Sequence, residues 1–183
     1  VRFTSPSFQK GATVFEARCL NGKRPAGYLT FARYGSKYFH LLGTSAPIHR
    51  LNEERSPDLD SDELATQYLR FFCASITGDY GCFSIVSSPD QVFFFVNLPP
   101  NQWTRIRGGI GPPKLKQVEK DDKKVWEART YVQYGPNLFN AVFHLDDGNV
   151  SMVEDEQVLE LPGAAYYAYA NGLRIQKTDP PDA

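Results

Sequence analysis

The stretch from Asp60 to Gly78 constrains the fold more than any other part of the sequence. Asp60 and Glu63 form a predicted capping pair, in which one side chain accepts the free amide protons of the first helical turn and the other reaches back. Gly78 supplies a left-handed residue for the helix end. Between them, apolar side chains recur at the three-and-four spacing of a helix: Leu64, Ala65, Tyr68, Leu69, Phe72, Cys73 and Ile76. We therefore predict a helix over about residues 61–78 with one buried face.

The other apolar segments are short, rich in β-branched or aromatic residues, and separated by turn residues, which is typical of strands. The clearest is Thr13 to Leu20, whose alternation predicts that Phe15, Ala17 and Cys19 face the core. Residues 146–149 predict a hairpin turn between two further strands. The sequence therefore predicts an α+β fold, a twisted and mainly antiparallel sheet of nine or ten strands packed on one principal central helix.

Several connecting segments lack regular periodicity. We expect residues 43–59 to cross the surface toward the helix, because the segment carries Pro47 and Pro57 and few periodic apolar residues. Residues 99–113 are rich in Gly and Pro and are predicted to be irregular, and residues 114–124 are either a short helical turn or a solvated strand. Residues 82–86 and 91–98 are predicted to form a hairpin that leans on the helix.

A short motif occurs twice in the chain. Residues 14–18 (V-F-E-A-R) resemble residues 125–129 (V-W-E-A-R), and each copy is followed by Tyr-Gly and then by Phe-His-Leu, with different spacings. One explanation is an ancient duplication that left two similar meanders flanking the helix. The other is that similar strand patterns solve similar packing problems.

Length and composition set further bounds. The 183 residues are enough for a single α+β domain, which we place at residues 1–178, with residues 179–183 as a tail or linker. The linker-like tail suggests an adjacent domain in a larger polypeptide. A formal charge of −1 argues against general nucleic-acid binding, and no apolar run approaches the ~20 residues of a membrane span. Three cysteines without a C-x-x-C pair indicate a reducing, cytoplasmic environment.

The glycine-rich segment after Arg105 is the clearest candidate for ligand binding. Its glycines would let backbone amides approach an anion, and nearby Arg and Lys side chains would supply positive charge. The candidate residues are Arg105, Arg107, Gly108, Gly109, Gly111 and Lys114. The alternative is a flexible basic loop without a ligand.

Three residues are candidates for acid–base or thiol chemistry. His40 and His144 carry imidazoles, the side chain whose ordinary pKa lies nearest neutral pH, and Cys82 follows a glycine. The structural alternatives are outward-facing imidazoles on a sheet and a buried strand cysteine. The histidine and cysteine spacings match no metal site, and no motif for a cofactor is present, so we expect neither.

Two classes of function follow. The first is a non-enzymatic recognition module that binds a protein partner through an aromatic sheet surface and the 99–113 loop, because tyrosine is abundant and no acid, base and nucleophile converge. The second is a small hydrolase or transferase whose anionic substrate is held by Arg105 and Arg107. An exposed aromatic patch would favour the first class. A pocket with a histidine beside Cys82, or beside a carboxylate of perturbed pKa, would favour the second.

Overall fold

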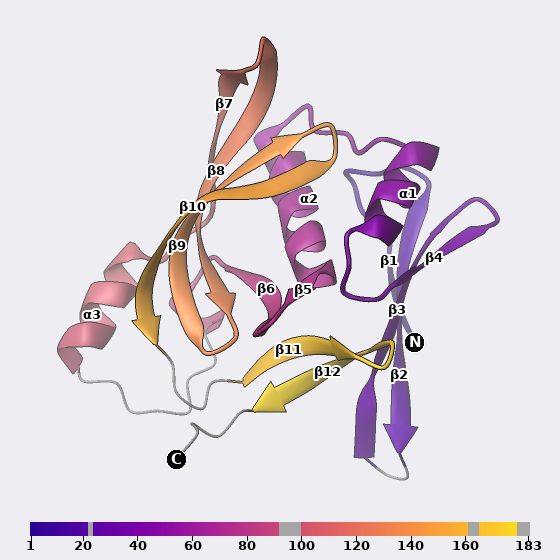
Figure 1. Ribbon diagram of the computed structural model, residues 1–183, viewed down its shortest axis with the longest axis horizontal. Helices are drawn as coiled ribbons and strands as arrows, with labels where there is room; N and C mark the ends of the chain where they lie inside the picture. The colour runs from indigo at the N-terminus through magenta and orange to yellow at the C-terminus, as the bar shows by residue number, and fades with distance from the viewer. Residues whose placement is uncertain (22–23, 92–99, 161–164, 179–183) are drawn as a thin grey trace.

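A computed structural model describes residues 1–21, 24–91, 100–160 and 165–178, and it has two six-stranded sheets with a helix between them (Figure 1). The strands are β1 (Arg2–Thr4), β2 (Ala12–Asn21), β3 (Arg24–Tyr34), β4 (Lys37–Leu41), β5 (Thr77–Gly78), β6 (Gly81–Val86), β7 (Lys114–Lys120), β8 (Lys123–Tyr134), β9 (Asn137–Asp146), β10 (Asn149–Glu160), β11 (Ala165–Ala170) and β12 (Leu173–Thr178). The α-helices are α1 (Ala46–Glu54), α2 (Asp62–Ser75) and α3 (Pro100–Gly109), with a short 3-10 turn at Pro89–Gln91.

The first sheet has the order β1-β2-β3-β12-β11, with β4 also paired to β3. The second has the order β10-β9-β8-β6-β5, with β7 paired to the first half of β8. Every paired strand is antiparallel to its neighbour, and one of the sheets curves into a half-barrel. Mainly antiparallel α+β architecture is therefore confirmed, although there are two sheets where one was predicted.

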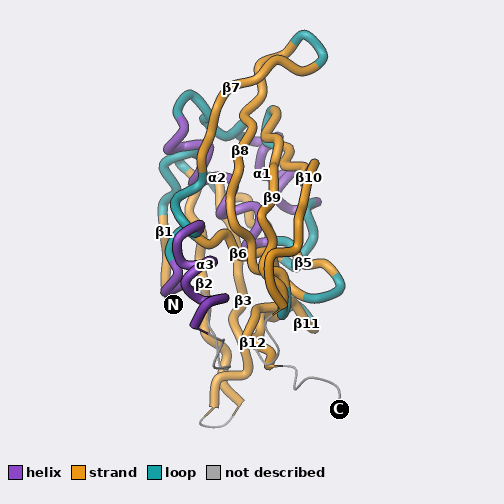
Figure 2. Tube along the Cα trace, turned by 90° about the vertical axis from the view of Figure 1, so that its left-hand side faces the viewer, coloured by secondary structure: helices purple, strands orange, loops and turns teal. Residues whose placement is uncertain are grey.

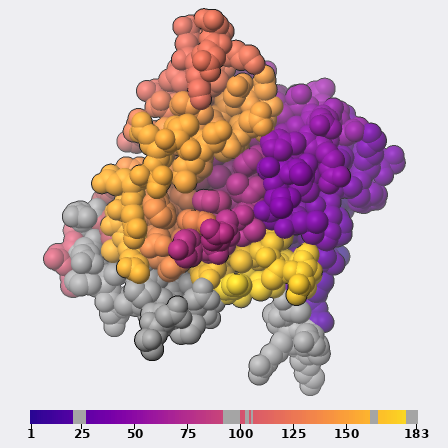
Figure 3. All heavy atoms as spheres, viewed as in Figure 1, coloured from indigo at the N-terminus to yellow at the C-terminus, as the bar shows by residue number. Residues whose placement is uncertain are grey.

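The C-terminal hairpin β11–β12 belongs to the first sheet although it follows the second in sequence. It joins at Arg174, whose Cα partner on β3 is Tyr28. The Arg174 guanidinium contacts the Glu16 carboxylate and lies 4.7 Å from the ring centre of Tyr167. Figure 3 shows this hairpin filling the space below α2 and between the two sheets. The C-terminal hairpin thus pairs with the N-terminal strands and completes the first sheet.

The predicted face of α2 is confirmed. Ala65, Tyr68, Leu69, Phe72 and Cys73 are buried, and they pack with Leu41 of the first sheet and with Ala128, Phe143 and Leu145 of the second. The predicted start of the helix is confirmed to within one residue, but the predicted cap, Asp60, and the predicted end at Gly78 were wrong. Ser61 is the N-cap, because its side chain accepts the Leu64 amide proton, and the helix ends when Ile76 becomes extended and Gly78 enters β5.

Two helices lie where the sequence predicted none. Helix α1 occupies part of the expected surface crossing and buries Pro47, Ile48 and Leu51, too few apolar positions to give a periodic pattern. Helix α3 occupies most of the expected irregular loop. Proline is tolerated in its first turn, where the missing N–H has no partner to lose, and Gly108 and Gly109 come only at its last two positions.

Two other strand predictions had mixed outcomes. Residues 114–120 form strand β7, so the solvated-strand alternative is confirmed over the helical turn. The hairpin turn at Asp147–Gly148 is also confirmed, since both residues have the positive φ that a two-residue hairpin turn requires. The predicted strand at 91–98 lies outside the described residues from 92 onward, as does the tail at 179–183.

The repeated motif occupies different places in the two sheets. The first copy lies on β2 and its Tyr-Gly turn comes one strand later, between β3 and β4. The second copy and its Tyr-Gly turn follow each other on β8. The two turns are alike, with φ of +57° at both Gly35 and Gly135. Similar local turns in different connectivity favour convergence of strand patterns over two equivalent meanders.

Figure 2, turned by 90°, shows an elongated molecule with the β7–β8 hairpin projecting at one end. In the described part of the chain, no helix has both the length and the apolar content to cross a bilayer.

Candidate functional site

Strands β1 to β4 have one face packed against the interior and one face turned outward. Val14, Ala32 and Phe39 pack with Leu51 of α1, so they define the inner face. Side chains alternate along a strand, and the neighbours of these residues therefore point to the opposite side, which we call the outer face. The prediction that Phe15, Ala17 and Cys19 face the core was wrong, because these residues belong to the outer face.

Aromatic side chains line up across the outer face. Phe3 on β1 is paired with Phe15 on β2, Phe15 with Phe31 on β3, and Phe31 with His40 on β4. The rings of Phe31 and His40 are stacked, with centres 4.4 Å apart. Directly paired residues are the closest neighbours on a sheet face, so the four form a continuous aromatic row from one edge to the other.

Large apolar side chains around this row are exposed. Phe3 is 73% exposed, Tyr38 65% and Leu42 43%, and Val1 at the start of β1 is 87% exposed. Phe15, Phe31 and Leu29 are only half-buried. Exposed apolar residues scattered singly are ordinary, but a contiguous group on one sheet face is typical of a surface that another molecule covers.

The N-terminal strands are also strongly basic. Residues 1–45 carry seven Lys and Arg side chains against one carboxylate, whereas the whole chain carries 20 against 21. Arg33 lies on the outer face, with its guanidinium 5.6 Å from the ring centre of Phe15. The overall charge of −1 therefore conceals a basic N-terminal region and a remainder with 13 basic groups against 20 acidic ones.

The structure gives the three acid–base or thiol candidates different surroundings. His40 Nε2 lies 3.2 Å from the Gly172 carbonyl oxygen at the β11–β12 turn. Cys82 is buried on β6, where desolvation raises the pKa of its thiol to about 11, partly offset by Arg174. His144 is on the second sheet, with Nε2 3.8 Å from Glu127 Oε2. A buried thiol with a raised pKa is a poor nucleophile, which agrees with the structural alternative for Cys82.

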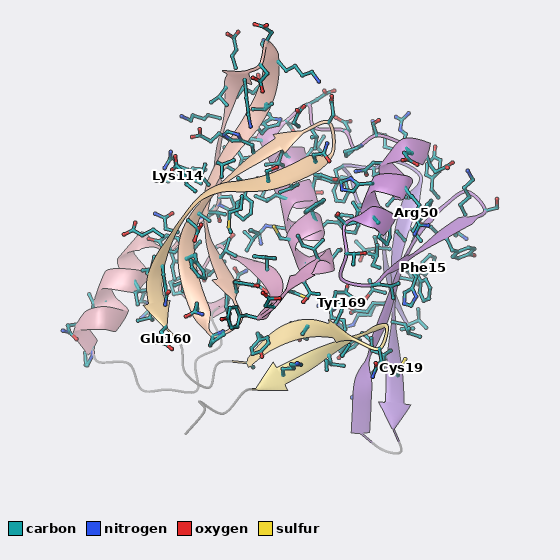
Figure 4. All side chains as sticks on the ribbon, in the orientation of Figure 1. Phe15, Cys19, Arg50, Lys114, Glu160 and Tyr169 are labelled. Carbon is teal, nitrogen blue, oxygen red and sulfur yellow. The ribbon has the colours of Figure 1, made fainter. Side chains whose placement is uncertain are left out.

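The predicted anion-binding segment is divided between a helix and a strand. Arg105, Arg107, Gly108 and Gly109 belong to α3, and the side chain of Arg105 lies outside the described part of the structure. Gly109, Gly111 and Lys114 line a cavity of about 250 Å³ together with Arg129, Tyr131 and Asn140. Figure 4 labels Lys114 on the second sheet and Phe15 on the first, on opposite sides of the molecule.

Three features weigh against a strong anion site in this cavity. Gly108 and Gly109 lie inside α3, where helical hydrogen bonds engage their amides, and the following Ile110 amide donates to the Ile106 carbonyl. The cavity also lies at the C-terminal end of α3, where the helix dipole disfavours negative charge. Arg129 is already near two carboxylates, with Nε 3.4 Å from Glu127 Oε1 and Nη2 3.8 Å from Glu154 Oε2. The outer face is the stronger candidate site.

Sequence reasoning missed the role of Phe3, Phe31 and Leu42 in this surface. Alternation in β2 showed two distinct faces but did not show which one was buried, since Phe15 and Val14 are both apolar. The charge of Glu16 made the Val14 side look solvent-facing, whereas Glu16 is partly buried and pairs with Arg174.

No family model matches this sequence, and comparison with curated proteins and with solved structures likewise gave no match.

Proposed function

We propose that this chain is a recognition module that binds a protein partner through the outer face of β1–β4. One observation carries the proposal: an aromatic row lies in register across four strands on one face, and Phe3 of this row and Tyr38 on the same face are 73% and 65% exposed. Aromatic side chains supply much of the binding energy at protein interfaces, because they bury a large area and lose little conformational freedom.

The chemistry of the face indicates what kind of partner it fits. Aliphatic residues such as Val1, Leu29 and Leu42 accompany the aromatic row, and aliphatic groups favour an apolar protein surface over nucleic-acid bases. Arg33 on the outer face and the basic charge of residues 1–45 favour acidic groups at the rim of that surface. The partner is therefore a protein segment with apolar side chains flanked by Asp or Glu.

Selection of binding peptides from a random library tests this proposal on the isolated protein. We expect the selected peptides to combine apolar residues with Asp or Glu and to bind in competition with each other. Phe3→Ser and Tyr38→Ser should each weaken their binding about tenfold or more, because an aromatic side chain that an interface buries can contribute ~1.4 kcal/mol or more. Both side chains are largely exposed, so the fold is expected to tolerate the changes.

Tyr80→Ser is the matched control, because Tyr80 is 57% exposed but lies beside the second sheet, in contact with Tyr134. It should leave binding unchanged. Peptides that bind equally well to all three variants would contradict the proposal. Selective binding of single-stranded oligonucleotides in place of acidic peptides would contradict the assigned partner class.

A further inference from the structure

The edge strand β10 carries an exposed segment in which apolar and acidic side chains are neighbours. Met152 and Val153 are 45% and 42% exposed, and the exposed acidic residues at 154–156 follow them directly. The pairing of β10 with β9 shifts register between Met152 and Glu154, so Val153 has no paired residue on β9. A bulge of this kind interrupts the ladder and turns the strand outward. Residues 152–156, which we call the β10 segment, therefore present two large apolar side chains beside three carboxylates.

The charge of this strand is only partly neutralised within the molecule. Strand β10 contains four carboxylates and no Lys or Arg. Glu154 Oε2 lies 3.8 Å from Arg129 Nη2. Asp155 and Glu156 have no ion-pair partner among the described residues. These two carboxylates are therefore available to basic groups of another molecule.

The outer face of β1–β4 has the opposite charge. Glu16 is the only carboxylate among residues 1–45, and it pairs with Arg174 on the other side of the sheet. Arg33 is exposed on the outer face, beside the ring of Phe15. The outer face thus combines an aromatic row with positive charge, and it carries no carboxylate that would repel an acidic segment.

The β10 segment has the composition that this face requires of a partner, which is apolar side chains flanked by Asp or Glu. Outside the first sheet, the exposed large apolar side chains of the described residues are Tyr80, Met152 and Val153. Tyr80 is a single residue that follows one carboxylate and contacts Tyr134. The β10 segment is therefore the part of this chain that best complements the outer face.

The two surfaces cannot meet within one molecule. Figure 4 labels Phe15 and Glu160, the last residue of β10, on opposite sides of the protein. A second copy must therefore supply the β10 segment. Acidic side chains oppose backbone pairing of an edge strand with another strand, but a basic sheet face attracts them.

We propose that the outer face of β1–β4 binds the β10 segment of a second copy of this chain, an inference that rests on the proposed function and names its partner. Met152 and Val153 cover the aromatic row. The two carboxylates without an internal partner lie at its basic rim, beside Arg33. Because the two surfaces differ, each bound pair keeps one free outer face and one free β10 segment, and the contact repeats into chains or rings larger than a dimer.

Sedimentation of the native protein over a series of concentrations tests the contact. We expect an average mass that rises with concentration and passes that of a dimer. A face variant and an edge variant should each move assembly to concentrations about tenfold higher or more, since each removes one side of the contact. The face variant is Phe3→Ser with Tyr38→Ser, and the edge variant is Asp155→Lys with Glu156→Lys.

The matched control is Glu53→Lys with Glu119→Lys, which changes the charge by the same amount at exposed positions of α1 and β7. It should assemble like the wild type. Mixing the face and edge variants gives the sharpest result, because the first keeps its β10 segment and the second keeps its outer face. An equal mixture should form a one-to-one dimer that grows no further, and this dimer would also show that both variants are folded.

Three results would overturn this self-recognition: a native protein that stays monomeric at its highest soluble concentration, a control that loses assembly as the edge variant does, or a mixture that forms no dimer. The peptide selection on the outer face separates these failures from failure of the proposed function. If selected peptides still bind and lose affinity with Tyr38→Ser, the face recognises a different protein. If they do not depend on the face, both proposals fail.

Discussion

Gly108 and Gly109 are neighbours on α3, but a side chain added at each would meet different surroundings. A Cβ at Gly108 has nothing within 4 Å, whereas a Cβ at Gly109 would lie 2.5 Å from the Tyr131 hydroxyl. Alanine reduces the entropy cost of a helical position by roughly 0.5–1 kcal/mol relative to glycine. We therefore expect Gly108→Ala to raise the melting temperature. Gly109→Ala should lower it, because the new methyl group would displace Tyr131, which packs against the cluster around Leu138. Equal shifts in both variants would contradict this packing.

The three cysteines should react in a defined order. Burial raises the pKa of Cys73 to about 12 and that of Cys82 to about 11, so almost none of either thiol is ionised at pH 8. Cys19 is partly exposed on the outer face. Because the thiolate is the reactive form, iodoacetamide should label Cys19 first in the native protein, as measured by peptide mass spectrometry. Fast labelling of Cys82 would show that it is not buried as described.

At the residue scale, the sequence predicted the buried residues of α2 but not the neighbours of residues on the strands. The buried stripe of α2 followed from helical spacing alone. The neighbours of His144 could not be predicted, because strand register depends on turn positions and on pairing between distant segments. Glu127 therefore became visible beside His144 only in the folded chain.

At the element scale, α2 connects the two sheets through a single apolar face. Phe72 is 4% exposed and belongs to the cluster that joins Leu41 of the first sheet to Phe143 of the second. Phe72→Ala should lower the free energy of unfolding by ~3–5 kcal/mol, measured by denaturant titration, because it leaves a cavity in that cluster. Gln67→Ala on the same helix is the control and should change stability by no more than about 0.5 kcal/mol. Similar losses of unfolding free energy in both variants would mean that this cluster is not the main source of stability.

Charged side chains protect the edge strand β10 from pairing with strands of other molecules. Among the described strands it pairs only with β9, and residues 151–157 are exposed, with acidic side chains at positions 154–156. Charged residues on a sheet edge oppose pairing with other chains, and β10 also has register shifts after Met152 and after Gln157. We expect Glu156→Val to increase aggregation on prolonged incubation, measured by light scattering, whereas Glu53→Val on α1 should not. Equal aggregation of the two variants would rule out an edge effect.

Elements were predictable from sequence in proportion to their length and regularity. Helix α2 has enough turns to give a clear apolar period, whereas α1 has only Pro47, Ile48 and Leu51 as buried positions. Helix α3 begins at Pro100 and ends with Gly108 and Gly109, so local composition favoured a loop. Both helices are stabilised by tertiary contacts: Leu51 of α1 packs with the first sheet, and Ile106 of α3 is buried against the second sheet.

At the scale of the whole molecule, the two sheets differ in charge and in what their free faces carry. The first has an apolar face on strands rich in Arg and Lys, and the second carries polar residues such as Glu127 and His144 and has an acidic edge. Composition averaged over the chain does not show that the two sheets differ in charge. Net charge and aromatic content therefore suggested a recognition function but not which sheet face would carry it. We propose that a protein partner covers the apolar face of β1–β4.

Site-specific photocrosslinking in cells of the source organism tests this claim most directly. A photoreactive phenylalanine derivative is placed at Tyr38 on the outer face or at Tyr80 as the control, both exposed positions. The account predicts a discrete crosslinked protein from position 38 that is absent from position 80, with the attached segment containing apolar residues flanked by Asp or Glu. No discrete product from position 38, or the same products from both positions, would contradict it.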